Sequence, residues 1–422
     1  MNGLELTYQT LANGCRCVFA PIPEAGLTCL DFWCKAGSAF EKPGEEGLAH
    51  FLEHMVFKGS QRLEAGAFDL RVEALGGSSN AATGFDDVHF HVLVPPDGAQ
   101  EALELLLDLV LEPALRADAY AMERDVVLEE IAQYRDQPDE QVVQQLLAAS
   151  CPTHPYGRPI LGWEDSLQAS TPATMAAFHR RRYRGPNCCL LVTGAIPDGL
   201  PQDLRSGRLA DLEGGSADGP ETDPAAPTQG SLSFQSGRSR IQVDRLEAAR
   251  LLMAWPAAPA GQQREVMGYD LATTLLAEGR RSRLVERLRE QLQIVESIDM
   301  DLTTLEQGSL VMLEACCPPE TIDEVEKEVH RVLRQCRTEP VEPEELERAR
   351  QLVGNGLRFS LEAPGSVAAI AGSQALWRTP QAPLAALADL DQWTAAELQR
   401  DVFSHLQPDQ AYTLVALPKE EG

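Results

Sequence analysis

Apolar and polar positions alternate with a period of two in the first part of the chain. Residues 4–20 and 27–36 show this alternation and contain enough β-branched side chains to be strands, with the sequence LANG as a hairpin turn. In the stretch Val88–Val94, the apolar side chains point to one face, while His89 and His91 point to the other. These stretches predict several strands of a sheet.

Other stretches repeat their apolar positions with a period near 3.6, which predicts helices. The first of these helices ends at Gly59. The last takes its apolar periodicity from Met122, Val126 and Leu128, and continues towards residue 150 with a break near Pro138. The predicted helices span residues 47–60, 65–75, 99–111 and 119–135.

Two histidines and a glutamate share one face of the helix over residues 47–60. His50 and His54 are four residues apart and Glu53 is three residues from His50, so all three side chains project from one stripe. This is the inverted zinc signature H-x-x-E-H, in which the histidines are ligands and the glutamate is a general base. Five residues can match by chance, and a lone histidine on an apolar face is usually a core residue. A third ligand therefore decides between a zinc site and a chance match in which the histidines are core residues.

A carboxylate that can complete the site lies in the helix over residues 119–135. A catalytic zinc ion needs three protein ligands and an open position for water. Glu130 can be the third ligand, and Glu123, two turns earlier on the same face, can orient a ligating imidazole. Glu129 points about 100° away from Glu130 and is the less suitable ligand. By itself, Glu123 would more often be an ordinary solvated helix charge.

The sequence around these residues resembles the pitrilysin-type metallopeptidases, and most of all their mitochondrial-processing-peptidase branch. The segment G-L-A-H-F-L-E-H-M-x-F-K-G carries the resemblance, followed by E-R-D-V-V-L-E-E-I. Three further segments match family motifs: N-A-x-T at residues 80–83, HPYG-x-PILG at residues 154–162 and Y-x-x-P-N at residues 183–187.

The resemblance implies roles for individual residues. Zinc is expected at His50, His54 and Glu130, with Glu53 as the catalytic base that activates water and Glu123 supporting the site. The segment Asn80, Ala81, Ala82 and Thr83 is expected to be an edge strand that binds an extended peptide by β-strand addition.

The second half of the chain repeats the first. The segment at residues 186–196 recurs in character at 408–418, and the helix start at Thr171 recurs at Thr394. Where the first copy has its zinc helix, the second has YDLATTLL at residues 269–276, without histidine or glutamate. We expect an α+β fold of two duplicated domains, each an antiparallel sheet packed by helices, and together half of a clamshell. The predicted domains are residues 1–200 with the metal site and 231–422 without one, joined by a linker or exposed loop at 201–230.

The second copy departs from the family at one position of consequence. Many members carry an arginine and a tyrosine seven residues apart, which hold the substrate and the developing oxyanion. Here Arg289 is present, but Gln293 stands at the glycine position of that pattern and Glu296 at the tyrosine position. An ionised carboxylate cannot donate a hydrogen bond. We therefore expect a dimer with a sibling subunit that supplies the Arg/Tyr pair.

Composition narrows the class of protein. The chain has 422 residues and a formal net charge of −28, which argues against nucleic acid or an anionic membrane as a partner. The charge indicates a solvated acidic surface rather than a chamber that attracts basic peptides. We see no secretion or transit signal and no apolar run long enough to span a membrane. Ten cysteines without a C-x-x-C pair indicate reduced thiols, so we expect a cytoplasmic protein.

Together these features predict a zinc endopeptidase that cleaves extended peptides or processing sites inside a closed dimeric chamber. One alternative is a non-catalytic peptide-binding or assembly subunit of the same fold, and another is an enzyme dedicated to processing one protein. His89 and His91 form an H-x-H pair that can bind metal from a strand. No other ligand lies beside them in the sequence, so we favour a structural interpretation of this pair.

Overall fold

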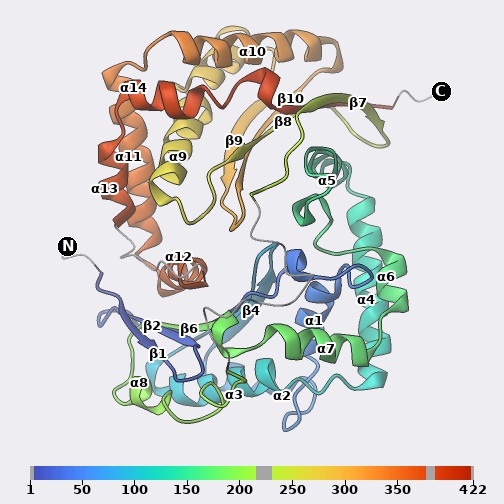
Figure 1. The fold of residues 1–422 in the computed structure, drawn as a ribbon, viewed down its shortest axis with the longest axis vertical. Coiled ribbons are helices and arrows are strands. Elements are labelled where there is room, and N and C mark those ends of the chain that lie inside the picture. The colour runs from blue at the N-terminus through green and yellow to red at the C-terminus, as the bar shows by residue number, and fades with distance from the viewer. Residues whose placement is uncertain (1–3, 215–230, 377–384, 420–422) are drawn as a thin grey trace. The chain divides into compact units, whose positions relative to one another are not determined.

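The computed structural model describes residues 4–214, 231–376 and 385–419 (Figure 1). The chain forms two compact units, and neither is continuous in sequence. Unit 1 consists of Met1–Ala132, Pro159–Thr228 and Arg358–Leu384. Unit 2 consists of Gln133–Arg158, Gln229–Leu357 and Ala385–Gly422.

Unit 1 is built on a six-stranded sheet in the order β1-β2-β6-β3-β5-β4. Neighbouring strands are antiparallel except for β2 and β6, which are parallel. Strands β3 and β6 are buried along their whole length because both faces of the sheet are covered. The strands are β1 (Thr7–Thr10), β2 (Arg16–Pro21), β3 (Thr28–Cys34), β4 (Ser78–Thr83), β5 (Val88–Val94) and β6 (Cys188–Gly194).

Helices cover both faces of this sheet (Figure 1). The main core lies on the face of Leu30, Phe32 and Phe90, against α1, α3, α4 and α7. On the opposite face, Val18 and Leu191 pack against the alanines of α12. The helices of unit 1 are α1 (Leu48–Val56), α2 (Ala67–Ala74), α3 (Ala99–Leu111), α4 (Ala117–Arg135), α6 (Glu164–Ala169), α7 (Pro172–Arg182), α8 (Leu200–Asp203) and α12 (Pro364–Leu376).

Unit 2 is built on a five-stranded sheet in the order β7-β11-β8-β10-β9, in which only β7 and β11 are parallel. Its main core lies under α9, α10, α11 and α13, and α5 packs on the other face. The strands are β7 (Gly237–Val243), β8 (Ala249–Ala257), β9 (Ser297–Thr303), β10 (Ser309–Cys317) and β11 (Tyr412–Pro418). The helices are α5 (Pro138–Ser150), α9 (Gln263–Ala277), α10 (Ile322–Thr338), α11 (Pro343–Ser360), α13 (Ala385–Gln392) and α14 (Ala395–Glu397).

The two sheets confirm the duplication predicted from the sequence. Without β1, the strands of unit 1 follow the same spatial order as those of unit 2, with the parallel pair in the same place. A capping box opens a helix at Thr171 and again at Thr394, 223 residues later. The mixed α/β fold class is therefore confirmed, with one correction: each sheet contains a parallel pair, because the last strand of each copy inserts beside the first.

One helix of each copy belongs to the unit of the other copy. Helix α5 follows α4 in the first half of the chain, and its Val142 and Leu146 pack against Leu252 and Leu414 of unit 2. Helix α12 follows α11 in the second half and packs on the sheet of unit 1. The predicted division at residues 200 and 231 did not include this exchange, and residues 215–230 of the predicted linker lie outside the described residues.

Most predicted helices are present with small differences in their ends. The prediction for α4 was wrong in one respect, because two of the residues assigned to its apolar face are exposed. Met122 and Val126 are exposed, at 66% and 51% of their surface. The buried face of α4 instead carries Tyr120, Glu123 and Val127. A carboxylate occupies a buried position, which the hydrophobic pattern alone could not indicate.

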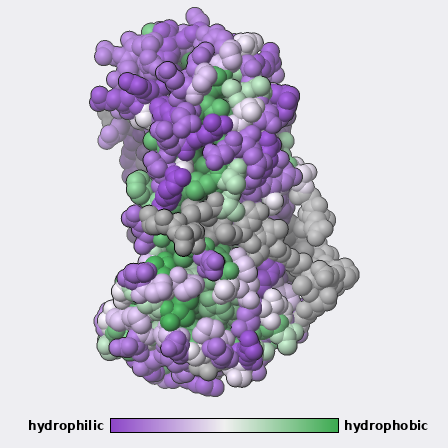
Figure 2. All heavy atoms as spheres, turned by 90° about the vertical axis from the view of Figure 1, so that its left-hand side faces the viewer, coloured by the Kyte–Doolittle hydropathy of each residue, from purple (hydrophilic) through white to green (hydrophobic). Residues whose placement is uncertain are grey.

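The hydrophilic surface and the free cysteines agree with the amino-acid composition. Hydrophilic side chains cover most of the face that Figure 2 shows, as a charge of −28 requires. All ten cysteines are free, and Cys15 and Cys17, two residues apart, are both in the core. Within the described ranges, no helix has the length and hydropathy of a membrane span.

The contact of α12 with the sheet can be tested at Gly372. A Cβ atom there would lie 2.4 Å from the ring of Trp33. We expect Gly372→Ala to lower the free energy of unfolding by about 1–3 kcal/mol, because the packed helix must shift. Gly356→Ala in α11 is the matched control, since a Cβ there meets nothing within 4 Å and should stabilise by up to about 1 kcal/mol. Urea unfolding of both variants measures the difference, and equal midpoints would contradict this account of the packing.

Candidate metal centre

The start of α1 is fixed by a carboxylate that the sequence analysis did not identify. Glu41 is 4% exposed and accepts hydrogen bonds from the backbone N–H groups of Gly47 (3.1 Å) and Ala49 (2.7 Å). The first N–H groups of a helix have no intrahelical partner, and a negative charge there is favoured by the helix dipole. Glu41 therefore stabilises the helix at the end from which the metal motif begins.

Two glycines bring the HPYG-x-PILG loop against the same helix end. Gly47 and Gly162 both have positive φ, at 92° and 76°, which favours glycine. A Cβ atom on Gly162 would lie 2.2 Å from the nitrogen of Gly47, and one on Gly47 would lie 2.4 Å from the oxygen of Leu161. Only glycine at both positions allows this contact.

Helix α1 buries one face and presents the other to the site. Leu48, Phe51, Leu52 and Met55 belong to the core of unit 1. This orientation turns His50 and His54 towards α4, on the opposite side of the helix from the core. The predicted amphipathic helix is present, although it ends at Val56 rather than at Gly59.

The histidines converge on Glu130 from α4. Nε2 of His50 lies 3.8 Å from Oε2 of Glu130, and Nε2 of His54 lies 3.5 Å from the same oxygen. Four protein or water donors around zinc, at about 2.0–2.1 Å from the ion, are about 3.4 Å apart in a tetrahedron. The observed separations are close to this value, so the three side chains fit a zinc ion with one position left open.

The protonation of the cluster also fits a metal. Burial, with a smaller effect of His54, lowers the pKa of His50 to about 4. His50 is therefore neutral near pH 7, which is the form that binds metals. Its Nδ1 is buried and has no hydrogen-bond partner among the described residues.

Glu123 holds the second histidine from behind. Its Oε1 is 2.9 Å from Nδ1 of His54, and its Oε2 is 2.7 Å from Nζ of Lys58. A carboxylate at Nδ1 fixes that nitrogen as the donor and leaves Nε2 free to bind a metal. Glu123 therefore contacts one of the two histidines of the cluster that it is predicted to support. Lys58, which balances its charge, was missed, although it follows His54 by four residues and shares its face.

Glu53 lies outside the ligand cluster, where a general base belongs. The possible metal cluster on α1 and α4 consists of His50, His54 and Glu130, without Glu53. The Thr83 hydroxyl donates a hydrogen bond of 2.5 Å to Oε2 of Glu53. Burial raises the pKa of Glu53 above its usual value, against the smaller opposing effect of this hydrogen bond.

Thr83 connects this glutamate to the predicted substrate segment. Residues Asn80–Thr83 lie in β4, the last strand of the sheet order, so one edge of β4 faces no strand among the residues that the structure describes. Asn80 and Ala82 are exposed. Such an edge offers backbone groups to an added strand. The sequence identified the segment, but not the contact between its Thr83 and Glu53.

Unit 2 has no counterpart of the cluster among its described residues. The positions 223 residues after His50 and His54 are Thr273 and Ala277 of α9. Those after Glu123 and Glu130 are Leu346 and Val353 of α11, both buried in the core. Apolar side chains thus take the places of the carboxylates, as expected for a second copy without a metal.

The residues of unit 2 at the Arg/Tyr positions of the family pattern can be located in the structure. Gln293 has φ of 55°, a conformation that favours glycine, which agrees with the alignment of this position with the glycine of the family pattern. Arg289 is bonded to its neighbour Glu290, with Nη2 3.0 Å from Oε1. Glu296 is exposed, and its Oε2 accepts from the thiol of Cys316 at 3.6 Å.

Two family descriptions match consecutive parts of the chain. Residues 25–164 match "Insulinase (Peptidase family M16)" and residues 170–353 match "Peptidase M16 inactive domain". The chain belongs to peptidase family M16. The division into an active and an inactive domain agrees with the cluster in unit 1 and its loss in unit 2.

Relatives and solved structures agree with this assignment. The chain is 29% identical to an uncharacterized zinc protease of Mycobacterium tuberculosis, over 85% of this chain and 80% of that protein. It is 25% identical to one of Bacillus subtilis, over 85% of both. A protease from Helicobacter pylori has the same fold, with a TM-score of 0.88 at 23% identity, covering 98% of this chain and all of that one.

The choice between Glu130 and Glu129 can be tested by metal content. Glu129 is exposed, whereas Glu130 points at both histidines. We expect Glu130→Gln to lower the zinc bound per chain by about one equivalent, because it removes a ligand. Glu129→Gln is the matched control and should keep the wild-type content. Elemental analysis after dialysis against a fixed free zinc concentration gives the result, and the reverse order of the two variants would show that the ligand is Glu129.

Proposed function

We propose that this M16 protein is a zinc-dependent endopeptidase that cleaves extended peptides. The observation that carries the proposal is the combination of the His50/His54/Glu130 cluster with a separate buried carboxylate, Glu53, held by the edge strand. A structural zinc site would need four protein ligands and no neighbouring base. The relatives named zinc proteases support the same reaction class.

The residues divide the chemistry between them. When bound, zinc supplies a Lewis acid that makes water a nucleophile near neutral pH. Glu53 would accept a proton from the water that attacks the peptide carbonyl and would return it to the leaving amine. A raised pKa suits this exchange, since the carboxylate must both accept and return a proton. Glu123 keeps His54 in the tautomer that binds metal.

Backbone pairing would hold the substrate. The unpaired edge of β4 ends at Thr83, whose hydroxyl donates a hydrogen bond to Glu53. A peptide added to this edge would therefore pass beside the proposed base. Such pairing reads the main chain and needs an extended segment. Backbone pairing supports cleavage of unfolded peptides and gives little sequence specificity. An enzyme dedicated to processing one protein would need another surface that recognises that substrate.

The cellular setting is proposed from the thiols. All ten cysteines are free, and nine of them are buried. Free thiols in this number are typical of a reducing compartment, which supports the cytoplasm.

Substitution of the base separates binding from chemistry. Glu53→Gln keeps the size and the hydrogen bond from Thr83 but cannot accept a proton. We expect unchanged zinc content and a loss of peptidase activity of about 10²–10⁴-fold or more. Glu129→Gln, a carboxylate change on the exposed side of α4, should retain both. If Glu53→Gln cleaves a fluorogenic peptide at the wild-type rate, the proposed mechanism is wrong. If wild type cleaves no peptide, either alone or together with a sibling of the same fold, the alternative of a non-catalytic peptide-binding or assembly subunit is favoured.

We further propose that the active form is a heterodimer with a sibling of the same fold. The resemblance to half-length relatives implies that the second domain of one subunit faces the zinc of the other. A homodimer would then bring the exposed Glu296 to the place of an oxyanion donor. Loss of such a donor typically costs about 10²–10³ in rate. A sibling that keeps the arginine and tyrosine would restore it.

The heterodimer has a direct test. Peptidase activity of the purified chain should rise about 10²–10³-fold on adding the sibling subunit from the same organism. Glu296→Tyr should raise the activity of the chain alone, since the phenol can donate a hydrogen bond. Glu290→Tyr places the same side chain six residues away and serves as the control. Full activity of the chain alone, unchanged by the sibling and by Glu296→Tyr, would exclude the heterodimer.

A further inference from the structure

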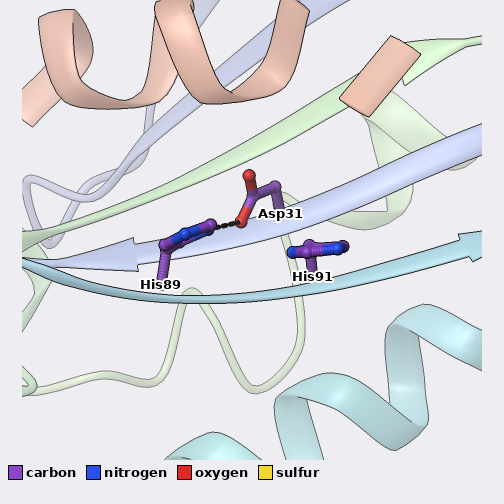
Figure 3. Close-up of side chains that lie close together, drawn as sticks. All are labelled: Asp31, His89 and His91. Carbon is purple, nitrogen blue, oxygen red and sulfur yellow. Dashed lines mark hydrogen bonds and ion pairs between the residues drawn. The ribbon is translucent and has the colours of Figure 1, made fainter. Parts of the chain in front are cut away.

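A second group of possible metal ligands lies on the other face of the unit 1 sheet. It consists of Asp31 from β3 and His89 and His91 from β5 (Figure 3). The apolar residues of β5 point to the main core, so its two histidines point to the face that α12 covers. His89 and His91 were interpreted as structural because no ligand lies near them in the sequence. The neighbouring strand supplies one.

The geometry brings three donors together. Asp31 is paired directly with His91 across the two strands, and its Oδ1 lies 3.1 Å from Nδ1 of His89. One donor atom from each residue lies within 4.8 Å of the others. Asp31 is only 2% exposed and the side chain of His89 19%, so this carboxylate is largely withdrawn from water. Burial of a charge is costly unless a partner compensates it.

An ordinary Asp–His ion pair accounts for only part of this group. Burial by itself would lower the pKa of His89, but the hydrogen bond and the charge of Asp31, with Asp87 and Glu53, raise it overall. His91 has no such partner: no hydrogen bond to its ring nitrogens occurs among the described residues, and burial lowers its pKa. Figure 3 shows its ring beside Asp31 with no bond drawn to it. The half-buried ring of His91 stacks on that of His89 and faces the Asp31 carboxylate without a hydrogen bond to it.

The fold itself does not require these residues. In unit 2, β10 carries Met312 and Glu314 at the positions 223 residues after His89 and His91, and Leu252 is the residue paired with Glu314. Helix α5 covers that face through apolar contacts that include Leu252 and Met312. The aspartate and the two histidines are therefore a feature of unit 1 alone.

We propose that Asp31, His89 and His91 form a second site for a divalent transition-metal ion. Two imidazoles and one carboxylate suit zinc and its first-row neighbours, and three protein ligands leave positions open for water or another ligand. The ion would join β3 to β5, the strand that supports the edge strand β4. The residues of this site are separate from the His50/His54/Glu130 cluster, and the argument for it does not rest on the proposed peptidase reaction.

The test uses the full chain with the first cluster disabled. Glu130→Gln should retain about one equivalent of Zn²⁺ per chain, and Glu130→Gln with His91→Ala should retain about none. Glu130→Gln with His405→Ala is the matched control, because His405 is exposed and belongs to neither cluster, and it should bind as Glu130→Gln does. Isothermal titration with Zn²⁺ and elemental analysis measure the stoichiometry. Equal binding by the His91→Ala and His405→Ala proteins, or no binding by Glu130→Gln, would overturn the proposal.

A second readout locates the ion without depending on the stability of His91→Ala. The ring of Trp33 stacks on His89 with centroids 4.2 Å apart, so paramagnetic Co²⁺ at this site should quench its fluorescence. We expect quenching in Glu130→Gln, its loss in Glu130→Gln with Asp31→Asn, and a reduced signal change in Glu130→Gln with Trp33→Phe. Circular dichroism confirms the fold of each variant. Quenching that persists in the folded Asp31→Asn protein would show that the ion binds elsewhere.

Discussion

The hydrogen bond between Glu123 and His54 joins the two helices on which the candidate metal centre depends. It links α1 to α4 across 69 residues of sequence and fixes which nitrogen of His54 faces Glu130. Glu123 is a nearly buried carboxylate, and an unpaired charge in that position would be strongly destabilising. His54 and Lys58 both compensate it, and both come from the end of α1 or just beyond it. The same contact therefore holds the helices together and orients a ligand.

The position of α1 depends in turn on the sheet and on the loop beside it. One face of the helix is fixed by the core, and its start is fixed by Glu41 and by the contact of Gly47 with Gly162. Thr83 then connects the base Glu53 to the edge strand. Each catalytic candidate is thus held by an element of regular structure rather than by a loop, and precise placement of reacting groups requires such support.

Comparison of the two units separates what the fold needs from what the site needs. The same strand order and the same capped helices occur twice, but carboxylates at two positions of α4 become Leu346 and Val353 in α11. Burying apolar side chains there is favourable, whereas burying the carboxylates needs partners. In unit 1 the buried carboxylate Glu123 has such partners in His54 and Lys58, whereas the corresponding position of unit 2 needs none. The exchange of α5 and α12 gives each sheet a cover from the other half of the chain, so neither half of the sequence can complete its unit alone.

The sequence by itself indicated the duplicated fold and the zinc signature, and it predicted Glu130 rather than Glu129 as the third ligand. These follow from periodicity and spacing along single helices, which are local properties of the chain. The tertiary structure decided what local spacing cannot express. In the folded chain, Met122 and Val126 of α4 lie at the surface and Glu123 faces His54. Two helices are exchanged between the units, and Glu41 lies at the start of α1. The tertiary structure also set Asp31 beside His89 and His91, because strand pairing joins residues that are 58 and 60 positions apart in the sequence.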